Sequence, residues 1–156
     1  HLVFSTLHTN DAPSSITRLQ NMGTPNYLIS AALTLIMAQR LARKNCSECS
    51  IIDENVTPKL LNSIGFLPEQ SARAKIYKGK GCDQCGNSGY KGRMGIYEIL
   101  EIDKELKQGI LSDLSQTELN SIAKKNGFKT MQEMGHDLLL SGDLSFSEYE
   151  RVLQSN

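Results

Sequence analysis

The chain has 156 residues, of which 39% are hydrophobic and 22% charged, so it can bury a core as one domain or two small ones. It has no run of about 18 apolar residues, which excludes a membrane-spanning helix from the predicted elements. The net charge is zero, but residues 1–93 hold 11 Lys and Arg against 6 Asp and Glu, and residues 94–156 hold 6 against 11.

The basic excess of residues 1–93 has two interpretations. Charge runs usually belong to a solvated surface, and the alternative is a positive face for an anionic partner or a complementary subunit. The balanced total charge and the lack of aromatic residues among the basic ones argue against a nucleic-acid partner.

The apolar run His1–Leu7 predicts a buried strand followed by polar residues. Asn10 or Asp11 is expected to cap the next helix, with Pro13 in its first turn, and Gly23 ends it. Because the chain begins within an apolar run at a residue other than Met and shows no signal peptide, we expect a piece of a larger protein.

A long second helix is predicted from Pro25 or Asn26 to about Arg43. Its apolar residues recur at helical spacing and form one wide face: Leu28, Ile29, Ala32, Leu33, Ile36, Met37 and Leu41. Gln39 and Arg40, near the end of this helix, are less easily explained by packing.

Four cysteines form two CxxC pairs separated by 32 residues, and the chain has no other cysteine: Cys46, Cys49, Cys82 and Cys85. Two such pairs favour a closed tetrahedral S4 site for structural Zn²⁺. Two disulfides or a redox dithiol remain alternatives, although neither pair has the βαβ setting of a thioredoxin motif. Reduced, metal-bound cysteines suit the cytoplasm.

Between and after the cysteine pairs, the sequence predicts short elements. Thr57 before Pro58 starts a helix that Gly65 ends, and residues 66–75 are expected to be loop. Residues 90–100 resemble a turn that leads into a short strand. The glycine-rich piece around them lacks the GK[ST] end of a phosphate-binding loop.

The last third is predicted to be helical, starting with a helix from Asp103 to about Leu111. Three further helix starts carry the capping-box pattern: Ser115 with Glu118, Thr130 with Glu133, and Ser145 with Glu148. Apolar positions on these helices are expected to face one another in a small bundle. His136, without an obvious partner, is interpreted as a surface or internally satisfied histidine.

Residues alone do not assemble an active site, because a histidine such as His1 or His8 needs a positioned partner for catalysis. In combination, however, several segments occur in an informative order: HLVFSTLHTNDA at 1–12, ITRL at 16–19, AQRLARK at 38–44, the two CxxC pairs, and GYKGRMGIYE at 89–98. This combination resembles the carboxyl-terminal part of the secretion ATPase superfamily, in the branch that drives type IV pilus assembly and type II secretion.

The resemblance implies an α/β fragment at residues 1–44 that ends a RecA-like ATPase core. A tetracysteine zinc module at 45–90 and a mainly α-helical carboxyl-terminal subdomain at 91–156 follow. The parent protein would be an ATPase that works as a homo-hexamer at the cytoplasmic face of the bacterial inner membrane. It would use ATP and Mg²⁺ and act on a membrane platform protein, so its membrane association would be peripheral. The pilus-retraction branch generally lacks the cysteines, so their presence favours an extension or secretion motor.

The resemblance also implies roles for single residues. His1 and His8 match the two histidines of the family's His box, and His8, with Thr6 and Thr9, would lie near the nucleotide phosphates and couple hydrolysis to domain movement. Arg93 would approach the nucleotide or a neighbouring subunit. The Gln39–Arg40 pair would support the core or a subunit contact, and the four cysteines match the zinc ligands.

The family's P-loop, Walker B acid and catalytic Glu all precede the His box, and none of them is in this chain. Phosphoryl transfer depends on the P-loop and Mg²⁺, so we expect these 156 residues alone neither to hydrolyse ATP nor to bind it tightly. A stand-alone zinc-ribbon module for nucleic acid or protein and a dithiol redox protein remain the alternatives. A GxxxxGK[ST] segment upstream of His1 would favour the motor.

Overall fold

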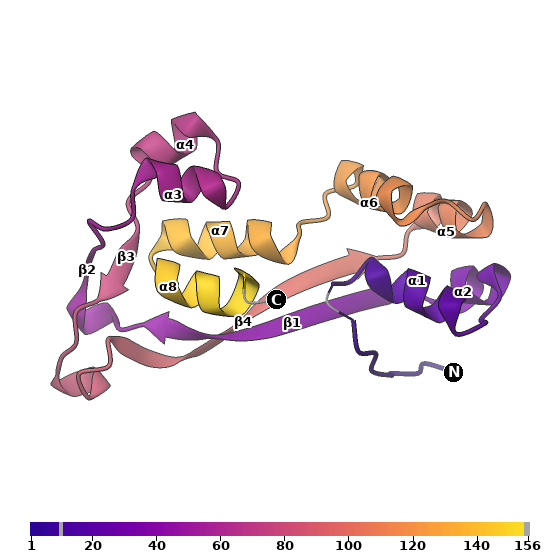
Figure 1. Ribbon diagram of the computed structural model, residues 1–156. Coiled ribbons are helices and arrows are strands. Elements are labelled where there is room, and N and C mark those ends of the chain that lie inside the picture. Colours follow the sequence, from indigo (N-terminus) through magenta and orange to yellow (C-terminus); the bar gives the residue numbers. More distant parts are fainter. Residues whose placement is uncertain (10, 155–156) are drawn as a thin grey trace. The chain divides into compact units, whose positions relative to one another are not determined.

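The computed structural model describes residues 1–9 and 11–154, which form two compact units (Figure 1). Each unit is assembled from two separate stretches of chain. The first comprises His1–Gln39 and Tyr97–Thr130, and the second comprises Arg40–Ile96 and the chain from Met131 onward. Among the described residues, no helix has both the length and the apolar character that a membrane span requires.

The first unit is built on four helices: α1 (Ser14–Asn21), α2 (Asn26–Ala32), α5 (Lys104–Leu111) and α6 (Gln116–Lys125). Helix α5 packs against both α2 and α6. Apolar residues from these helices, from strand β4 (Tyr90–Glu101) and from positions next to them form the core: Ala12, Ile16, Ile29, Leu100, Ile102, Leu106, Ile110, Leu119 and Ala123. This core holds the start of α1 in place, directly after the segment that contains His8.

The predicted strand at His1–Leu7 is wrong, because residues 1–9 have no regular secondary structure. Leu2, Val3 and Phe4 are 79%, 78% and 89% exposed. A strand is stable only when a neighbour pairs its backbone, and no strand among the described residues pairs with this segment. Pro13 is the N-cap residue of α1, but Asp11 does satisfy the first helical N–H as predicted, because its carboxylate accepts from Ser14 N–H at 2.7 Å. Asn10, the alternative cap, lies outside the described residues.

The predicted long second helix is wrong in its second half. Helix α2 ends at Ala32, Leu33 is extended, and strand β1 covers Leu35–Asn45. The stretch 35–42 is apolar or long-chained at nearly every position, so helical and strand periodicities fit it about equally well. Pairing with a distant strand decides between them.

That partner is β4 (Tyr90–Glu101), longer than the short strand that the sequence predicts. Ile102 N–H donates to Thr34 O at one end of the pair, and Cys46 N–H donates to Gly89 O at the other, both at 2.9 Å, so the strands are antiparallel (Figure 1). Between these bonds β4 has 12 residues and β1 has 11, which places a bulge in β4. Gly92, with a φ of 80°, has the backbone freedom that a bulge requires.

The second unit contains the cysteines. Strands β2 (Ser50–Ile52) and β3 (Tyr77–Gly79) pair antiparallel, with Ile51 opposite Lys78. Two short helices connect them, α3 (Pro58–Ser63) and α4 (Pro68–Arg73). The predicted start of α3 is confirmed by the bond from Leu60 N–H to Thr57 Oγ1 at 3.4 Å. The loop predicted over 66–75 is wrong, because Pro68 begins α4 and the Gln70 side chain accepts from Leu67 N–H.

Helices α7 (Met131–Ser141) and α8 (Phe146–Tyr149), followed by a π-helical turn at Glu150–Gln154, complete this unit. The predicted helices of the last third are therefore confirmed, but they contribute to two units instead of one small bundle. His136 is satisfied, since its Nε2 lies 3.0 Å from Tyr149 Oη and its ring packs on Phe66. Burial lowers the pKa of His136.

Candidate metal centre

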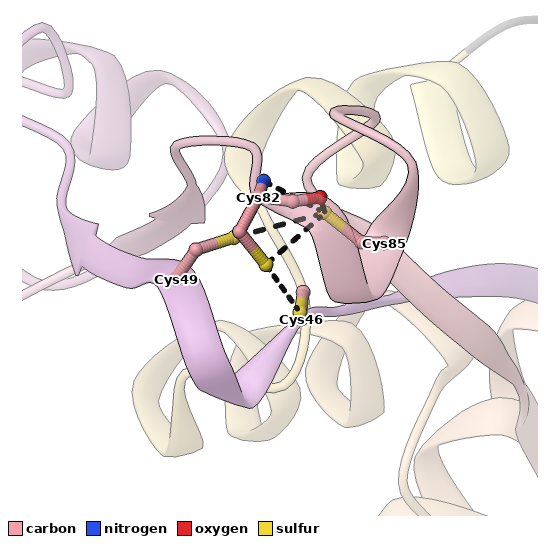
Figure 2. Close-up of side chains that lie close together, drawn as sticks. All are labelled: Cys46, Cys49, Cys82 and Cys85. Atoms are coloured by element: carbon pink, nitrogen blue, oxygen red, sulfur yellow. Dashed lines mark hydrogen bonds between the residues drawn. The ribbon is translucent and has the colours of Figure 1, made fainter.

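The four cysteine side chains converge at one point in the second unit (Figure 2). All four Sγ atoms lie within 4.8 Å of one another. The Sγ atoms of Cys46 and Cys82 are 3.9 Å apart, those of Cys49 and Cys85 are 3.9 Å apart, and those of Cys82 and Cys85 are 3.7 Å apart. All four thiols are free, so neither predicted alternative disulfide is formed.

These separations fit a shared metal ion. A tetrahedral site with metal–sulfur bonds of about 2.3 Å has sulfur–sulfur edges of about 3.8 Å, whereas a disulfide brings its sulfurs to about 2.05 Å. Three of the six sulfur–sulfur separations, at 3.7–3.9 Å, lie at the tetrahedral edge length, and the other three do not exceed 4.8 Å. Four thiols around one point leave no ligand position open to water, so the centre can hold a metal but offers it no catalytic coordination site.

Each CxxC pair lies on a tight turn, at Ser47–Cys49 and at Asp83–Cys85. Backbone N–H groups point at the sulfurs of both turns. Gly81 N–H donates to Cys49 Sγ at 3.3 Å, while Cys82 N–H and Gly89 N–H donate to Cys85 Sγ at 3.2 and 3.3 Å. Such donors stabilise the thiolate, the form that binds a metal.

Cys85 and Cys49, one from each pair, differ in the direction of their pKa shifts, and burial also raises the pKa of Cys82, the partner of Cys85 in its pair. Burial raises the pKa of Cys85, but the N–H donors of Cys82 and Gly89 outweigh this effect and lower the pKa to about 6. At Cys49 burial prevails over the single donor from Gly81 and raises the pKa to about 11. Cys85 is therefore the thiol best prepared to be a thiolate at neutral pH.

Two glycines bring the chain together beside the cysteines. A Cβ atom placed on Gly79 would lie 1.9 Å from Gly89 O, and one placed on Gly89 would lie 2.5 Å from Gly79 O. Gly89 also has a φ of 77°, a conformation that disfavours other residues. Strand β3 and the turn after Cys85 can approach this closely only because both positions lack side chains.

The strand that leads into Cys46 is anchored by a buried carboxylate. Glu148, whose side chain is 0% exposed, accepts from Arg43 N–H at 2.7 Å, from Arg43 Nε and Nη2 at 2.9 and 2.7 Å, and from the Arg151 guanidinium. Burial would raise the pKa of Glu148, but the bonds from Arg151 and Arg43 prevail and lower it to about 2. The Arg43 guanidinium also stacks 4.1 Å from the centre of the Tyr90 ring.

The next two residues of β1 are anchored as well. Lys44 Nζ pairs with Asp143 at 3.0 Å, and the Asn45 amide donates to Tyr77 O and Gly142 O at 3.1 and 2.9 Å. These residues line a cavity of about 420 Å³ beside Cys46. The metal centre thus rests on contacts from β1 to the segment between α7 and α8.

The remaining predicted site residues have no such common centre. His1 and Thr6 are exposed in the segment without secondary structure, and Arg93 is exposed on β4. His8 and Thr9 line a polar cavity of about 350 Å³ in the first unit, and Thr9 Oγ1 lies 2.8 Å from Ser15 Oγ. Gln39 Nε2 donates to Tyr97 Oη at 3.3 Å.

Sequence reasoning missed two buried carboxylates. Glu148 was expected to complete a capping box by bonding back to its own helix start. Instead, its carboxylate binds the two arginines, although Ser145 Oγ does accept from Glu148 N–H at 3.2 Å. Glu98, 2% exposed, accepts from Ala12 N–H at 2.7 Å. For Glu98, the one local signal is its place in the segment GIYEIL at 95–100. There the residues two positions before and after it are apolar, so a strand would turn Glu98 toward the same buried face.

Comparison with known proteins supports the family resemblance that the order of the sequence motifs indicated. The family described as "Type II/IV secretion system protein" matches residues 1–151. The type IV pilus assembly ATPase PilB of Thermus thermophilus is 42% identical over 148 residues, and its namesake in Pseudomonas aeruginosa is 41% identical over 152. The type II secretion system protein E of Aeromonas hydrophila is 33% identical over 159 residues.

These alignments cover 95%, 97% and 100% of the present chain but only 16%, 26% and 30% of the respective relatives. The chain therefore spans less than a third of the length of each of these relatives. The match covers the segment with His8, both cysteine pairs and the helices after them. With 151 of 156 residues matched, the chain belongs to the type II/IV secretion system protein family.

Proposed function

We propose that the chain is the carboxyl-terminal part of a motor ATPase that powers type IV pilus assembly or type II secretion. Family membership over residues 1–151 carries this proposal, together with 42% identity to a pilus assembly ATPase. The domain division at 1–44, 45–90 and 91–156 is part of the proposal, with the first segment ending a RecA-like core. The parent works as a hexamer at the cytoplasmic face of the inner membrane, and a platform protein there is its partner.

The metal of the cysteine centre is proposed to be Zn²⁺. Thiolates at tetrahedral separations favour Zn²⁺ or an iron–sulfur cluster, and a mononuclear S4 site with two CxxC turns is typical of structural zinc. Cys46, Cys49, Cys82 and Cys85 are its ligands. The metal holds the two turns together in a segment that has few buried apolar residues of its own.

His8, with Thr9, Thr6 and His1, is proposed to face the phosphates of ATP bound by the parent protein. The polar cavity that His8 and Thr9 line supports this role, because it also contains Arg18, whose charge suits an anion, while the carboxylate of Asp11 in the same lining accepts from Ser14 N–H. Arg93, exposed on β4, is proposed to approach the nucleotide or a neighbouring subunit. Phosphoryl transfer itself needs the P-loop and Mg²⁺ of the parent.

Two measurements test these proposals. Elemental analysis of the reduced 156-residue chain should give one zinc per chain and no iron, and replacement of Cys82 by Ser should abolish stoichiometric binding. The isolated chain should show no Mg²⁺-dependent ATP turnover, whereas the full-length parent should turn over ATP. Turnover by the isolated chain, or none by the parent, would contradict the assignment.

The alternative of a stand-alone zinc-ribbon module receives less support, because the family match extends well beyond the cysteine segment. That alternative requires salt-dependent binding of DNA or RNA. A dithiol redox protein would instead exchange disulfides and bind no metal.

A further inference from the structure

The residue Glu98 has a contact that the proposed function does not use. It lies on β4 within the first unit, is 2% exposed, and its Oε1 accepts from Ala12 N–H at 2.7 Å. The two residues are 86 positions apart in sequence. The distance is typical of a hydrogen bond to a carboxylate, which is stronger than one between neutral groups.

The donor at Ala12 is fully buried, with 0% of the residue exposed. A buried backbone N–H must find an acceptor, and Ala12 precedes the first turn of α1, where helical partners are not available. The carboxylate of Glu98 also lies at the amino-terminal end of α1, the end of a helix that favours negative charge. Glu98 therefore fixes the backbone where α1 begins.

Two side-chain contacts connect the start of α1 with residues that precede it, among them the predicted phosphate-facing Thr9. Asp11 accepts from Ser14 N–H at 2.7 Å, and Thr9 Oγ1 lies 2.8 Å from the hydroxyl of Ser15, which is 2% exposed. Thr9, Asp11 and Ser14 line one cavity together with His8. The contact from Glu98 thus holds one wall of that cavity.

We propose that Glu98 is a positioning residue for His8 and Thr9: its carboxylate holds Ala12, and through Ala12 it sets where these two side chains lie. The catalytic consequence of this inference rests on the proposed function, whereas the hydrogen bond between Glu98 and Ala12 does not depend on it. Glu98 touches neither ATP nor the reacting atoms. It acts by keeping Ala12, just before α1, against β4.

The experiment compares two substitutions. Glu98→Gln keeps an amide oxygen that can accept from Ala12 N–H, whereas Glu98→Ala removes the acceptor. In the 156-residue chain, hydrogen exchange at the Ala12 amide should accelerate about tenfold or more in Glu98→Ala and by less than about threefold in Glu98→Gln. Glu101→Ala, at an exposed position of the same strand, is the matched control and should leave the exchange unchanged.

In the full-length parent, Glu98→Ala should lower kcat about tenfold or more, because misplaced catalytic side chains are costly, while KM for ATP changes less than about threefold. Glu98→Gln should restore most of kcat, and Glu101→Ala should retain it. A purely structural role would lower the amount of folded enzyme and leave kcat per active site unchanged.

The results of these measurements distinguish the positioning role of Glu98 from the proposed function of the parent protein. Unchanged exchange at Ala12 in Glu98→Ala would overturn the positioning role, whatever the parent does. Accelerated exchange with a wild-type kcat would overturn it as well. A wild-type parent without ATP turnover would overturn the proposed function, and the exchange data would then show a contact with no catalytic consequence.

Discussion

At the scale of single residues, Gly79 limits what the metal centre tolerates. A methyl group there would lie 1.9 Å from the carbonyl oxygen of Gly89, and backbone cannot yield as a flexible side chain does. We therefore expect Gly79→Ala to push β3 away from the turn after Cys85 and to abolish stoichiometric metal binding. Elemental analysis and thermal unfolding of the purified variant measure both effects.

The matched control for this substitution is Gly86→Ala. Gly86 has a φ of 56°, but a Cβ there would meet no atom within 4 Å. This control should cost only the backbone penalty of about 1–2 kcal/mol and should retain the metal. Full metal retention by Gly79→Ala would show that the two backbones are not held as close as described.

From the buried carboxylate of Glu148 we expect a specific dependence of folding stability on pH. Its pKa is lowered in the folded chain to about 2, below its ordinary value of 4.5, so its contribution to stability is complete above pH 5 and is lost as the pH falls toward 2. A shift of this size corresponds to about 3 kcal/mol, and Glu148→Gln should lose most of it at pH 7. Urea unfolding of both proteins from pH 7 to pH 3 measures the difference.

Thiols also take up protons and release metal in acid, so the informative quantity is the difference between wild type and Glu148→Gln at each pH. That difference should shrink steadily below pH 5. A difference that is independent of pH would mean that the Glu148 side chain contributes through packing and not through its charge. Arg43 and Arg151 are half exposed, so water can solvate their guanidinium groups when Glu148 is replaced.

The cysteines show how far single residues can be predicted. Their spacing alone identified all four members of the centre, because CxxC restricts both sulfurs of a turn to one side. The distant partners of Glu98 and Glu148 could not be predicted, since Ala12 and Arg43 are 86 and 105 positions away. Pairing at such separations depends on the fold, which local patterns do not encode.

At the scale of elements, the start of α6 has a complete capping box. Ser115 Oγ accepts from Glu118 N–H at 3.4 Å, and Glu118 Oε2 accepts from Ser115 N–H at 2.9 Å. The bonds from Ser115 lower the pKa of Glu118. We expect Ser115→Ala to lower the free energy of unfolding by about 1 kcal/mol, measured by chemical denaturation.

Ser121→Ala is the control for this element. Its hydroxyl donates to Thr117 O within α6 and satisfies no group at the start of the helix. This substitution should change stability by less than about 0.5 kcal/mol. Equal losses in the two variants would refute the capping role of Ser115.

Helix starts were predictable because a cap is a local pattern. Ser115 and Thr57 cap the helices that they were predicted to start, and the helix predicted from Asp103 begins at Lys104 with Asp103 as its cap. The change from helix to strand after Ala32 was not predictable. Residues 33–43 satisfy either periodicity, and strand β1 exists because β4, more than 40 residues later, pairs with it. The sequence predicted β4 only as a short strand, because Gly92 and Gly95 interrupt the alternation of side chains that is typical of a strand.

At the scale of the whole molecule, the fold redistributes the charge. The first unit holds 6 Lys and Arg against 7 Asp and Glu, and the second holds 11 against 10. The contrast between the basic residues 1–93 and the acidic residues 94–156 therefore does not persist in the units, since each draws on both parts of the chain. Sequence position alone could not predict this mixing.

Metal removal should act on one unit. All four cysteines, the bonds from Asn45 to Tyr77 and Gly142, and the Arg43–Glu148 pair belong to the second unit, while the core of the first unit contains none of them. After chelation of the metal, we expect amide exchange to accelerate in β2 and β3 and to stay slow in α1, α5 and α6. Exchange measured by mass spectrometry distinguishes this from uniform unfolding.

The hydrogen bond from Cys46 N–H to Gly89 O joins the two ends of the segment that carries the cysteines. Residues 46–89 leave the β1–β4 hairpin and return to it at a single point, 2.9 Å from donor to acceptor. Because its two ends lie this close, a two-residue Asn-Gly turn could replace the segment and still close the hairpin, at the loss of the segment's own contacts, such as that of Phe66 with His136. We therefore expect a shortened chain, in which an Asn-Gly turn replaces residues 47–88, to keep β1 and β4 paired.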